Sequence, residues 1–301
     1  MSMRSLERLS VPEVPYARAV GLGAAAVGAA YIRKRQRDFV DASKELANPH
    51  PEVALYPGKR SEFAIKVHTG LFVDPFKYSK KVGPLLEDLG DVYSMRHGPN
   101  VEENLEADAE INKRIAGRRI ISIAISKGGL DYLRLQATKP EPEYTELAIF
   151  ESAVMKKEFV TKTGDRMART GRRLENSYAM AKLFEWRNNQ PAMREVRRTG
   201  PGAFPTAQVD AAVLMSDEPH FADSDIQRVM SEDYVGEVFA LAAPDDAMVH
   251  TAKGAEWLAG VTGRTVDHVI DDRRDPGEHA SFHRKPERLL YELKSRLYPE
   301  S

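Results

Sequence analysis

Cysteine is absent from this chain of 301 residues. Disulfides, thiolate catalysis and cysteine-based metal sites are therefore excluded. An excess of charge of either sign is also missing, because 44 basic and 45 acidic residues give a formal net charge of −1. No overall field would recruit nucleic acid or an anionic membrane. A hydrophobic content of 42% is nevertheless enough for a substantial core in a chain of this length.

A long apolar run is lacking as well. The apolar stretch 19–32 has 14 residues, whereas about 20 are needed to span a bilayer comfortably. Basic residues follow at 33–37, so the stretch is typical of a signal-peptide core, a short anchor with its basic end on the cytoplasmic side, or an amphipathic helix docked on the protein. We favour membrane association through 19–32, with a cytoplasmic protein as the alternative. The glycines of this stretch do not form a dinucleotide site, because no strand precedes them and their spacing is wrong.

The segment 121–129, ISIAISKGG, joins a fully apolar β-type run to a serine between very small residues. A sharp strand-to-helix turn that exposes a serine Oγ presses together the residues two before and two after it, so both must be nearly free of side chain. Ala124 and Gly128 meet this demand around Ser126. Residues 129–136 then carry apolar side chains at helical spacing. An ordinary helix cap after a buried strand is the alternative interpretation.

This arrangement resembles the G-x-S-x-G nucleophile elbow of the α/β-hydrolase family, with Ala124 in place of the first glycine. The resemblance implies that Ser126 is the nucleophile. It also implies an acid after a late strand and a histidine before the last helix, in the chain order Ser, acid, His.

The acid is sought after the buried-strand run 238–243, which Pro244, Asp245 and Asp246 follow at once. The resemblance favours Asp246 for this position, with Asp245 as the neighbouring alternative. A turn that only caps the following helix is the other interpretation.

The histidine is sought between a candidate strand, 265–270, and an amphipathic closing helix that begins near Pro286. His279 lies in this interval, where the family places its general base. His283 is four residues further on and is less favoured. His268 lies inside the predicted strand, where it packs or faces solvent.

The oxyanion hole of the family combines the N–H after the nucleophile with one from a loop after an early strand. The strand-like run 63–67 leads into His68, Thr69 and Gly70, which resemble the family's His-Gly loop with a threonine interposed. The resemblance implies that the backbone N–H groups of Leu71 and Lys127 are the donors. Taken alone, the tripeptide is an ordinary turn.

Strand signals alternate with helical patterns along most of the chain, which predicts an α/β fold with a mostly parallel central sheet flanked by helices. These signals lie at 63–68, 92–96, 119–125, 145–150, 237–243 and 265–270. Between 151 and 232 the alternation stops, so we expect a helical cap there. The expected organisation is an N-terminal arm at 1–60 with a linker at 38–60, a core made of 61–150 and 233–301, and the cap at 151–232.

Basic residues gather in the expected cap between 166 and 198, but acidic residues are interleaved with them and no aromatic-glycine motif accompanies them. A solvated helix face is therefore expected rather than a nucleic-acid site. The sequence as a whole predicts a serine hydrolase that cleaves an ester or related acyl bond of a small molecule, without a metal or organic cofactor. The alternatives are a non-catalytic binding or scaffold protein of the same fold, or an acyltransferase, thioesterase or peptidase with the same triad.

Overall fold

The computed structural model describes most of the chain between residues 51 and 299. The described residues are 29–31, 33–34, 51–70, 73, 75–139, 142–166, 214, 216, 220–280 and 284–299. Of the apolar stretch 19–32, only 29–31 is described, and it is helical and exposed. Within these ranges no helix combines the length and the apolar character that a bilayer crossing requires. Association of this stretch with a membrane stays a prediction.

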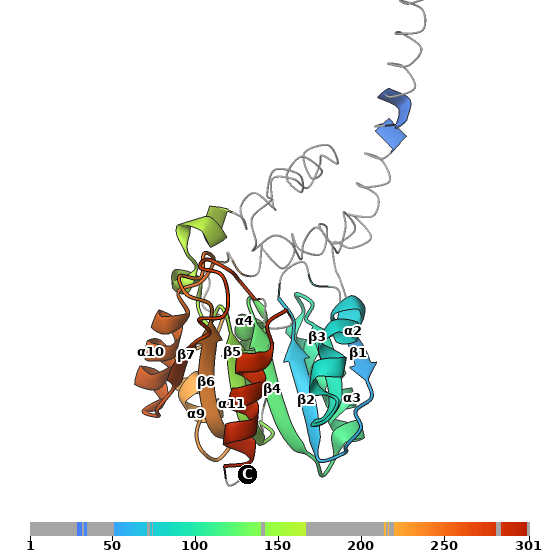
Figure 1. The fold of residues 1–301 in the computed structure, drawn as a ribbon, viewed down its shortest axis with the longest axis vertical. Coiled ribbons are helices and arrows are strands. Elements are labelled where there is room, and N and C mark those ends of the chain that lie inside the picture. The colour runs from blue at the N-terminus through green and yellow to red at the C-terminus, as the bar shows by residue number, and fades with distance from the viewer. Residues whose placement is uncertain are drawn as a thin grey trace, which may run out of the picture.

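A sheet of seven strands in the order β1-β3-β2-β4-β5-β6-β7 forms the centre of the described structure (Figure 1). The strands are β1 (Glu52–Tyr56), β2 (Phe63–His68), β3 (Gly90–Arg96), β4 (Arg119–Ile125), β5 (Thr145–Glu151), β6 (Val235–Ala242) and β7 (Asp267–Ile270). β1 runs antiparallel to β3, and every other neighbouring pair is parallel. The predicted mostly parallel sheet is thereby confirmed.

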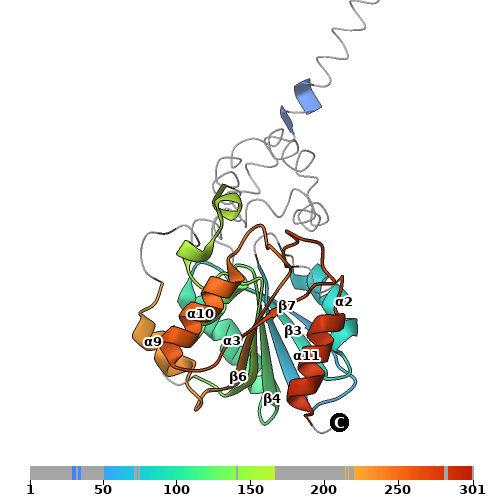
Figure 2. The same cartoon turned by 60° about the vertical axis from the view of Figure 1, so that its left-hand side comes forward.

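Helices cover both faces of the sheet (Figure 2). The helices α2 (Pro75–Leu86) and α11 (Glu287–Leu297) pack on one face. The other face carries α3 (Val101–Ile115), α4 (Gly128–Thr138), α9 (Asp223–Val229) and α10 (Thr251–Thr262). A short 3₁₀ helix, η1 (Lys157–Phe159), follows β5.

The central strand β4 shows why both faces need helices. Ile121, Ile123 and Ile125 belong to the core under α2 and α11, whereas Ala124 and Ile120 belong to the cores on the opposite face. A strand buried on both faces appears in the sequence as an unbroken apolar run, as this one does. Because β2 and β4 to β7 are parallel, the residues that follow them lie along one edge of the sheet.

The strand β1 is a correction to the sequence analysis, which assigned residues 38–60 to a linker. Its five residues lie between Pro51 and Pro57 and pair with β3 at the margin of the sheet. Prolines are tolerated beside an edge strand because only one of its sides must pair. Leu55 of β1 remains exposed, which is consistent with this marginal place.

Only the two ends of the expected cap, 151–232, are described. The helix α9 near its C-terminal end packs with α4 and α10. The residues between 167 and 213 lie outside the described part of the chain. The division into arm, core and cap therefore stays a prediction.

A buried cluster of charges joins β2 to the helices on one face. Asp108 of α3 is fully buried between Lys66, whose Nζ lies 2.8 Å from its carboxylate, and Lys139, whose Nζ bonds its other oxygen. Burial alone would raise the pKa of Asp108, but the two ammonium groups outweigh it and hold that pKa well below its ordinary value. Asp108 is consequently the nearest counterion of both buried lysines, and Glu143 lies further away, at 3.5 Å from Lys66 and 3.9 Å from Lys139.

Replacing Asp108 by alanine should destabilise the fold by about 3–5 kcal/mol, because two buried cations lose their nearest carboxylate. The matched control is Asp88→Ala, since the exposed Asp88 pairs with the exposed Lys59; it should change stability by less than about 0.5 kcal/mol. Urea unfolding measures both. Because the folded-state pKa of Asp108 lies below its ordinary value of 3.8, its stabilisation is present above about pH 4 and is lost as the pH falls through the folded-state pKa. Equal losses in the two variants would contradict this account.

Candidate active site

Ser126 occupies the turn between β4 and α4 with a φ of 52°. This left-handed conformation is uncommon for a residue with a side chain and persists only where the surroundings fix it. The Ser126 N–H donates to the Glu151 carbonyl at 3.2 Å, and the Ser126 carbonyl accepts from the N–H groups of Gly129 at 3.1 Å and Val154 at 2.8 Å. The N–H and the carbonyl of Ser126 are thus both bonded to the chain at the end of β5, and the carbonyl also bonds the first turn of α4.

Two glycines make this turn possible. A Cβ added to Gly128 would lie 2.1 Å from the carbonyl oxygen of His68. A Cβ added to Gly70 would lie 2.7 Å from the Cβ and 3.2 Å from the Oγ of Ser126. The chain that leaves β2 therefore passes directly beside both the serine and the start of α4. Ala124, in place of the family's glycine, is buried in the core below α4 and fits there.

The side chains of Ser126, His279 and Asp246 form one hydrogen-bonded series. His279 Nε2 lies 2.8 Å from Ser126 Oγ, across 153 positions of sequence. His279 Nδ1 lies 3.0 Å from each carboxylate oxygen of Asp246. Asp246 follows β6 and His279 follows β7, so the parallel strands deliver all three residues to the same edge of the sheet. The structure therefore brings together the three side chains on which the sequence prediction depends.

Asp246 is held by its own turn. Its Oδ1 accepts the backbone N–H groups of Met248 at 2.8 Å and Val249 at 3.1 Å. Burial would raise its pKa, but the attraction of His279 and these donors prevail, so the pKa of Asp246 lies below its ordinary value and the group is ionised near neutral pH. Asp245, the alternative in the sequence analysis, takes the preceding turn position with a φ of 51°, and it is Asp246 that contacts His279.

Histidine 279 is 12% exposed at its side chain. Burial lowers the pKa of its imidazole, but the Asp246 carboxylate more than offsets this, so the pKa of His279 lies above its ordinary value of 6.5. In the neutral ring, Nδ1–H donates to Asp246 and Nε2 accepts from the Ser126 hydroxyl. His283, the other candidate, lies outside the described residues. His268 is exposed on β7, as the sequence analysis allows.

Of the two backbone donors expected for an oxyanion hole, the structure describes one, Lys127. Lys127 lies at the start of α4, directly after Ser126, and its buried Nζ pairs with the Asp131 carboxylate at 2.7 and 2.5 Å. Leu71 lies outside the described residues. The loop before it is well anchored, because the N–H and the hydroxyl of Thr69 both donate to the Met95 carbonyl, at 2.8 and 2.9 Å.

Two residues beside the site had no place in the sequence analysis. Arg274 lies on the loop that leads to His279, and Glu151 ends β5; their side chains form an ion pair that is fully buried. Arg274 stands in a polar loop and Glu151 at the end of an apolar run, so neither has a local pattern that distinguishes it from a surface residue. Their separation of 123 positions hides the pairing.

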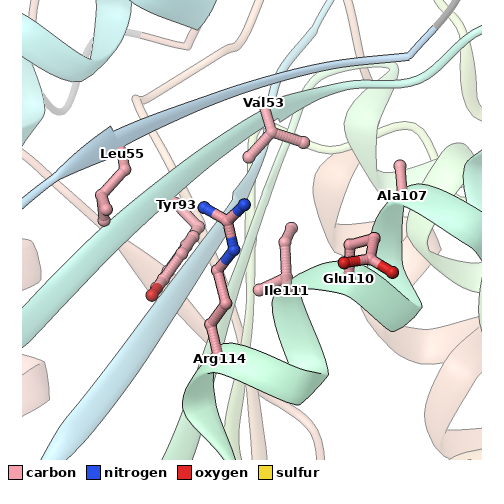
Figure 3. Close-up of a pocket in the computed structure, with 7 residues that line it drawn as sticks. All are labelled: Val53, Leu55, Tyr93, Ala107, Glu110, Ile111 and Arg114. Atoms are coloured by element: carbon pink, nitrogen blue, oxygen red, sulfur yellow. The ribbon is translucent and has the colours of Figure 1, made fainter.

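A separate hollow of about 200 Å³ lies between β1, β3 and α3. Figure 3 shows Arg114 of α3 extending toward Tyr93 and Val53 of the two strands, with Glu110 at its margin. No serine and no histidine is among its lining residues. In the described part of the chain, no group of three or more acidic or histidine side chains has the arrangement of a metal site. The serine turn is therefore the candidate active site.

Gly128→Ala should destabilise the protein by about 1–3 kcal/mol or more, because the added methyl group meets a backbone carbonyl that has little room to move. Gly260→Ala is the matched control. Gly260 lies in α10 with nothing within 4 Å of an added Cβ, so alanine should be neutral or stabilise by up to about 1 kcal/mol. Thermal unfolding of the two variants measures the contrast, and a Gly128→Ala protein as stable as wild type would refute the close approach.

Comparison with known proteins adds evidence at the level of structure. No protein-family model matches the chain, and a comparison with curated proteins finds no match. Among solved structures, the esterase RhEst1 from Rhodococcus sp. ECU1013 is similar with a TM-score of 0.59 and 14% identity, over 81% of this chain and 94% of that one. The carboxylesterase CesB (YbfK) from Bacillus subtilis is similar with a TM-score of 0.54 and 14% identity, over 89% and 98%.

MenH from S. aureus is similar as well, with a TM-score of 0.55 and 11% identity, over 83% of this chain and 99% of that one. Identities this low establish the shared fold alone. The parallel sheet, the helices on both of its faces and the strand-to-helix turn at Ser126 agree with that likeness. This chain therefore has the fold of the α/β-hydrolase superfamily.

Proposed function

We propose that the protein is a serine hydrolase that cleaves an ester or related acyl bond of a small molecule through an acyl-enzyme intermediate. The observation that carries this proposal is the hydrogen-bonded series from Ser126 Oγ through both nitrogens of His279 to Asp246, with donor–acceptor distances of 2.8 and 3.0 Å. A nucleophile that contacts a base, which in turn contacts a fixed carboxylate, is the arrangement that acyl transfer by serine requires. The esterase names of two structural neighbours support an ester as the substrate class.

In the proposed reaction, Ser126 Oγ attacks the acyl carbon while His279 Nε2 takes the hydroxyl proton. The tetrahedral intermediate collapses when the bond to the leaving alcohol breaks, and His279 returns the proton to that oxygen. Water then attacks the acyl-enzyme, again with His279 as the base, which releases the acid and restores the Ser126 hydroxyl. Asp246 keeps the Nδ1 proton in place and stabilises the imidazolium that forms at each step.

The proposed oxyanion donors are the backbone N–H groups of Lys127 and Leu71. Lys127 supports this role by its place at the N-terminus of α4, where the helix dipole favours negative charge. The anchored turn at Thr69 and Gly70, directly beside Ser126, supports a donor from the same loop. The role of Leu71 itself is carried over from the resemblance.

Ser126→Ala should abolish labelling by a fluorophosphonate probe and reduce the hydrolysis of a p-nitrophenyl ester by at least about 10³-fold, because what remains is catalysis by binding and by the oxyanion donors. Ser295→Ala is the matched control, since the Ser295 hydroxyl donates to the Glu292 carbonyl within α11; it should label and turn over as wild type does. Wild-type protein that resists the probe and hydrolyses no ester would favour a non-catalytic scaffold of the same fold.

Asp246→Asn should lower kcat by about 10⁴-fold, because an amide in place of the carboxylate selects the wrong imidazole tautomer. Asp245→Asn is the control at the adjacent position, where asparagine tolerates the left-handed backbone, and it should remain within a few-fold of wild type.

In the wild-type protein kcat/KM should rise with pH and reach half its maximum above pH 6.5, because the neutral form of His279 is the base and its pKa is raised. A half-maximum well below pH 6.5 would contradict the assignment of His279.

A further inference from the structure

Arg274 is a fully buried cation that bonds two fully buried carboxylates. Its Nε lies 2.9 Å from Asp271 Oδ2, and its Nη1 donates to Glu151 Oε1. Asp271 directly follows β7, whereas Glu151 is the last residue of β5. The guanidinium therefore joins two different strand ends below the loop that carries His279.

The main chain of Glu151 bonds the nucleophile. Its backbone carbonyl accepts the N–H of Ser126 at 3.2 Å, while its side chain bonds Arg274. Arg274 in turn lies five residues before His279 in the sequence. One residue thus connects the strained serine turn to the histidine loop, by main chain on one side and by an ion pair on the other.

The histidine loop is attached at two further points. The Asp271 N–H donates to the Ala242 carbonyl at 2.8 Å, and the Gly277 N–H donates to the Pro244 carbonyl at 2.8 Å. Ala242 ends β6, and Pro244 begins the turn that carries Asp246. These bonds fix the loop to the strand that presents the acid. Arg274 adds the connection to the strand beside the nucleophile.

Stability alone gives little reason for three buried charges at this place. Removing an arginine and two carboxylates from water is expensive, and well-packed apolar side chains of similar volume often serve stability as well or better. The cluster also carries one more negative than positive charge. Functional sites are places where buried charges are arranged to act on a neighbouring side chain.

We propose that Glu151 and Arg274 are positioning residues, which hold the loop of His279 against the turn of Ser126 and so set the alignment of the nucleophile with its base. The inference rests on the proposed function. It predicts that loosening this ion pair lowers kcat rather than substrate binding, because the reacting groups lose alignment while the substrate's contacts remain.

The same pair should change the titration of His279, which a purely structural role would not. The charged groups that act on the imidazole are Asp246 after β6, Glu151 at the end of β5, and Arg274 on its own loop; the two carboxylates raise the pKa of His279 and the guanidinium lowers it. Glu151→Gln keeps the size of the side chain and removes its negative charge. The pKa of His279 should then fall, so the activity should persist to lower pH.

The experiment measures kcat, KM and the pH dependence of kcat/KM on a p-nitrophenyl ester, with probe labelling of Ser126 in parallel. Glu151→Gln should lower kcat by roughly 10- to 100-fold with KM within a few-fold, and should move the half-maximal pH downward. Arg274→Lys should also lower kcat, since an ammonium replaces the two-pronged guanidinium, but should leave the half-maximal pH near wild type because the charge is kept.

Glu292→Gln is the matched control for loss of a buried carboxylate. Glu292 of α11 is 8% exposed at its side chain and pairs with two arginines, Arg288 at 2.8 Å and Arg296 at 3.3 Å. Arg296 also binds Asp267 at the start of β7, the end of the strand opposite to the candidate site. Glu292→Gln should reduce the melting temperature without changing kcat or the half-maximal pH.

The outcomes separate this inference from the proposed function. Wild-type protein that the probe does not label at Ser126 would overturn the proposed function. Wild-type protein that is labelled, together with a folded Glu151→Gln variant whose kcat and half-maximal pH equal those of wild type, would overturn the positioning role alone. If Glu151→Gln is poorly folded, the triple variant Glu151→Leu/Asp271→Asn/Arg274→Met removes all three buried charges together, so that no buried charge is left without its partner. Reduced kcat in that variant would support the inference, and wild-type kcat would overturn it.

Discussion

The contact between Gly128 and the backbone carbonyl of His68 is the constraint on which the candidate site depends. Because Gly128 has no Cβ, the start of α4 lies directly against the end of β2. That closeness forces the chain to turn within one residue, and Ser126 takes the left-handed conformation as a result. The same closeness places the loop after β2 beside the hydroxyl group. The half-buried position of the serine at this turn is therefore a product of how tightly two parallel strands and one helix are packed.

Hydrophobic periodicity and turn residues in the sequence were sufficient to predict most of the parallel strands. The strands at 63–68 and 119–125 have the bounds that the sequence analysis expected, because apolar runs of that length bounded by turn residues have few other structures. The last strand begins at Asp267 rather than at 265, since pairing with β6 starts at that residue. Ser126, Asp246 and His279 were found by order along the chain, and the sheet brings them together because parallel strands end at one edge.

Other features depend on partners far away in the sequence. Lys66 lies within a strand and would pass for a solvent-facing residue, yet Asp108, 42 positions later, allows it to be buried. Arg274 resembles any charged loop residue until Glu151 is known to lie beside it. β1 lies between two prolines, so only its pairing with β3 identifies it as a strand. In each case the energy that decides the structure comes from a tertiary contact, and a single sequence does not record which residues make it.

The chain has no cysteine, so no disulfide joins distant parts of it. Buried ion pairs between residues far apart in the sequence provide such connections instead. The clusters around Asp108 and Arg274 are buried rather than exposed. Mobile ions screen charges at the surface but reach buried pairs poorly. The geometry around Ser126 and His279 should consequently depend little on ionic strength. The alignment of these two side chains should therefore persist at salt concentrations that weaken contacts between exposed charges.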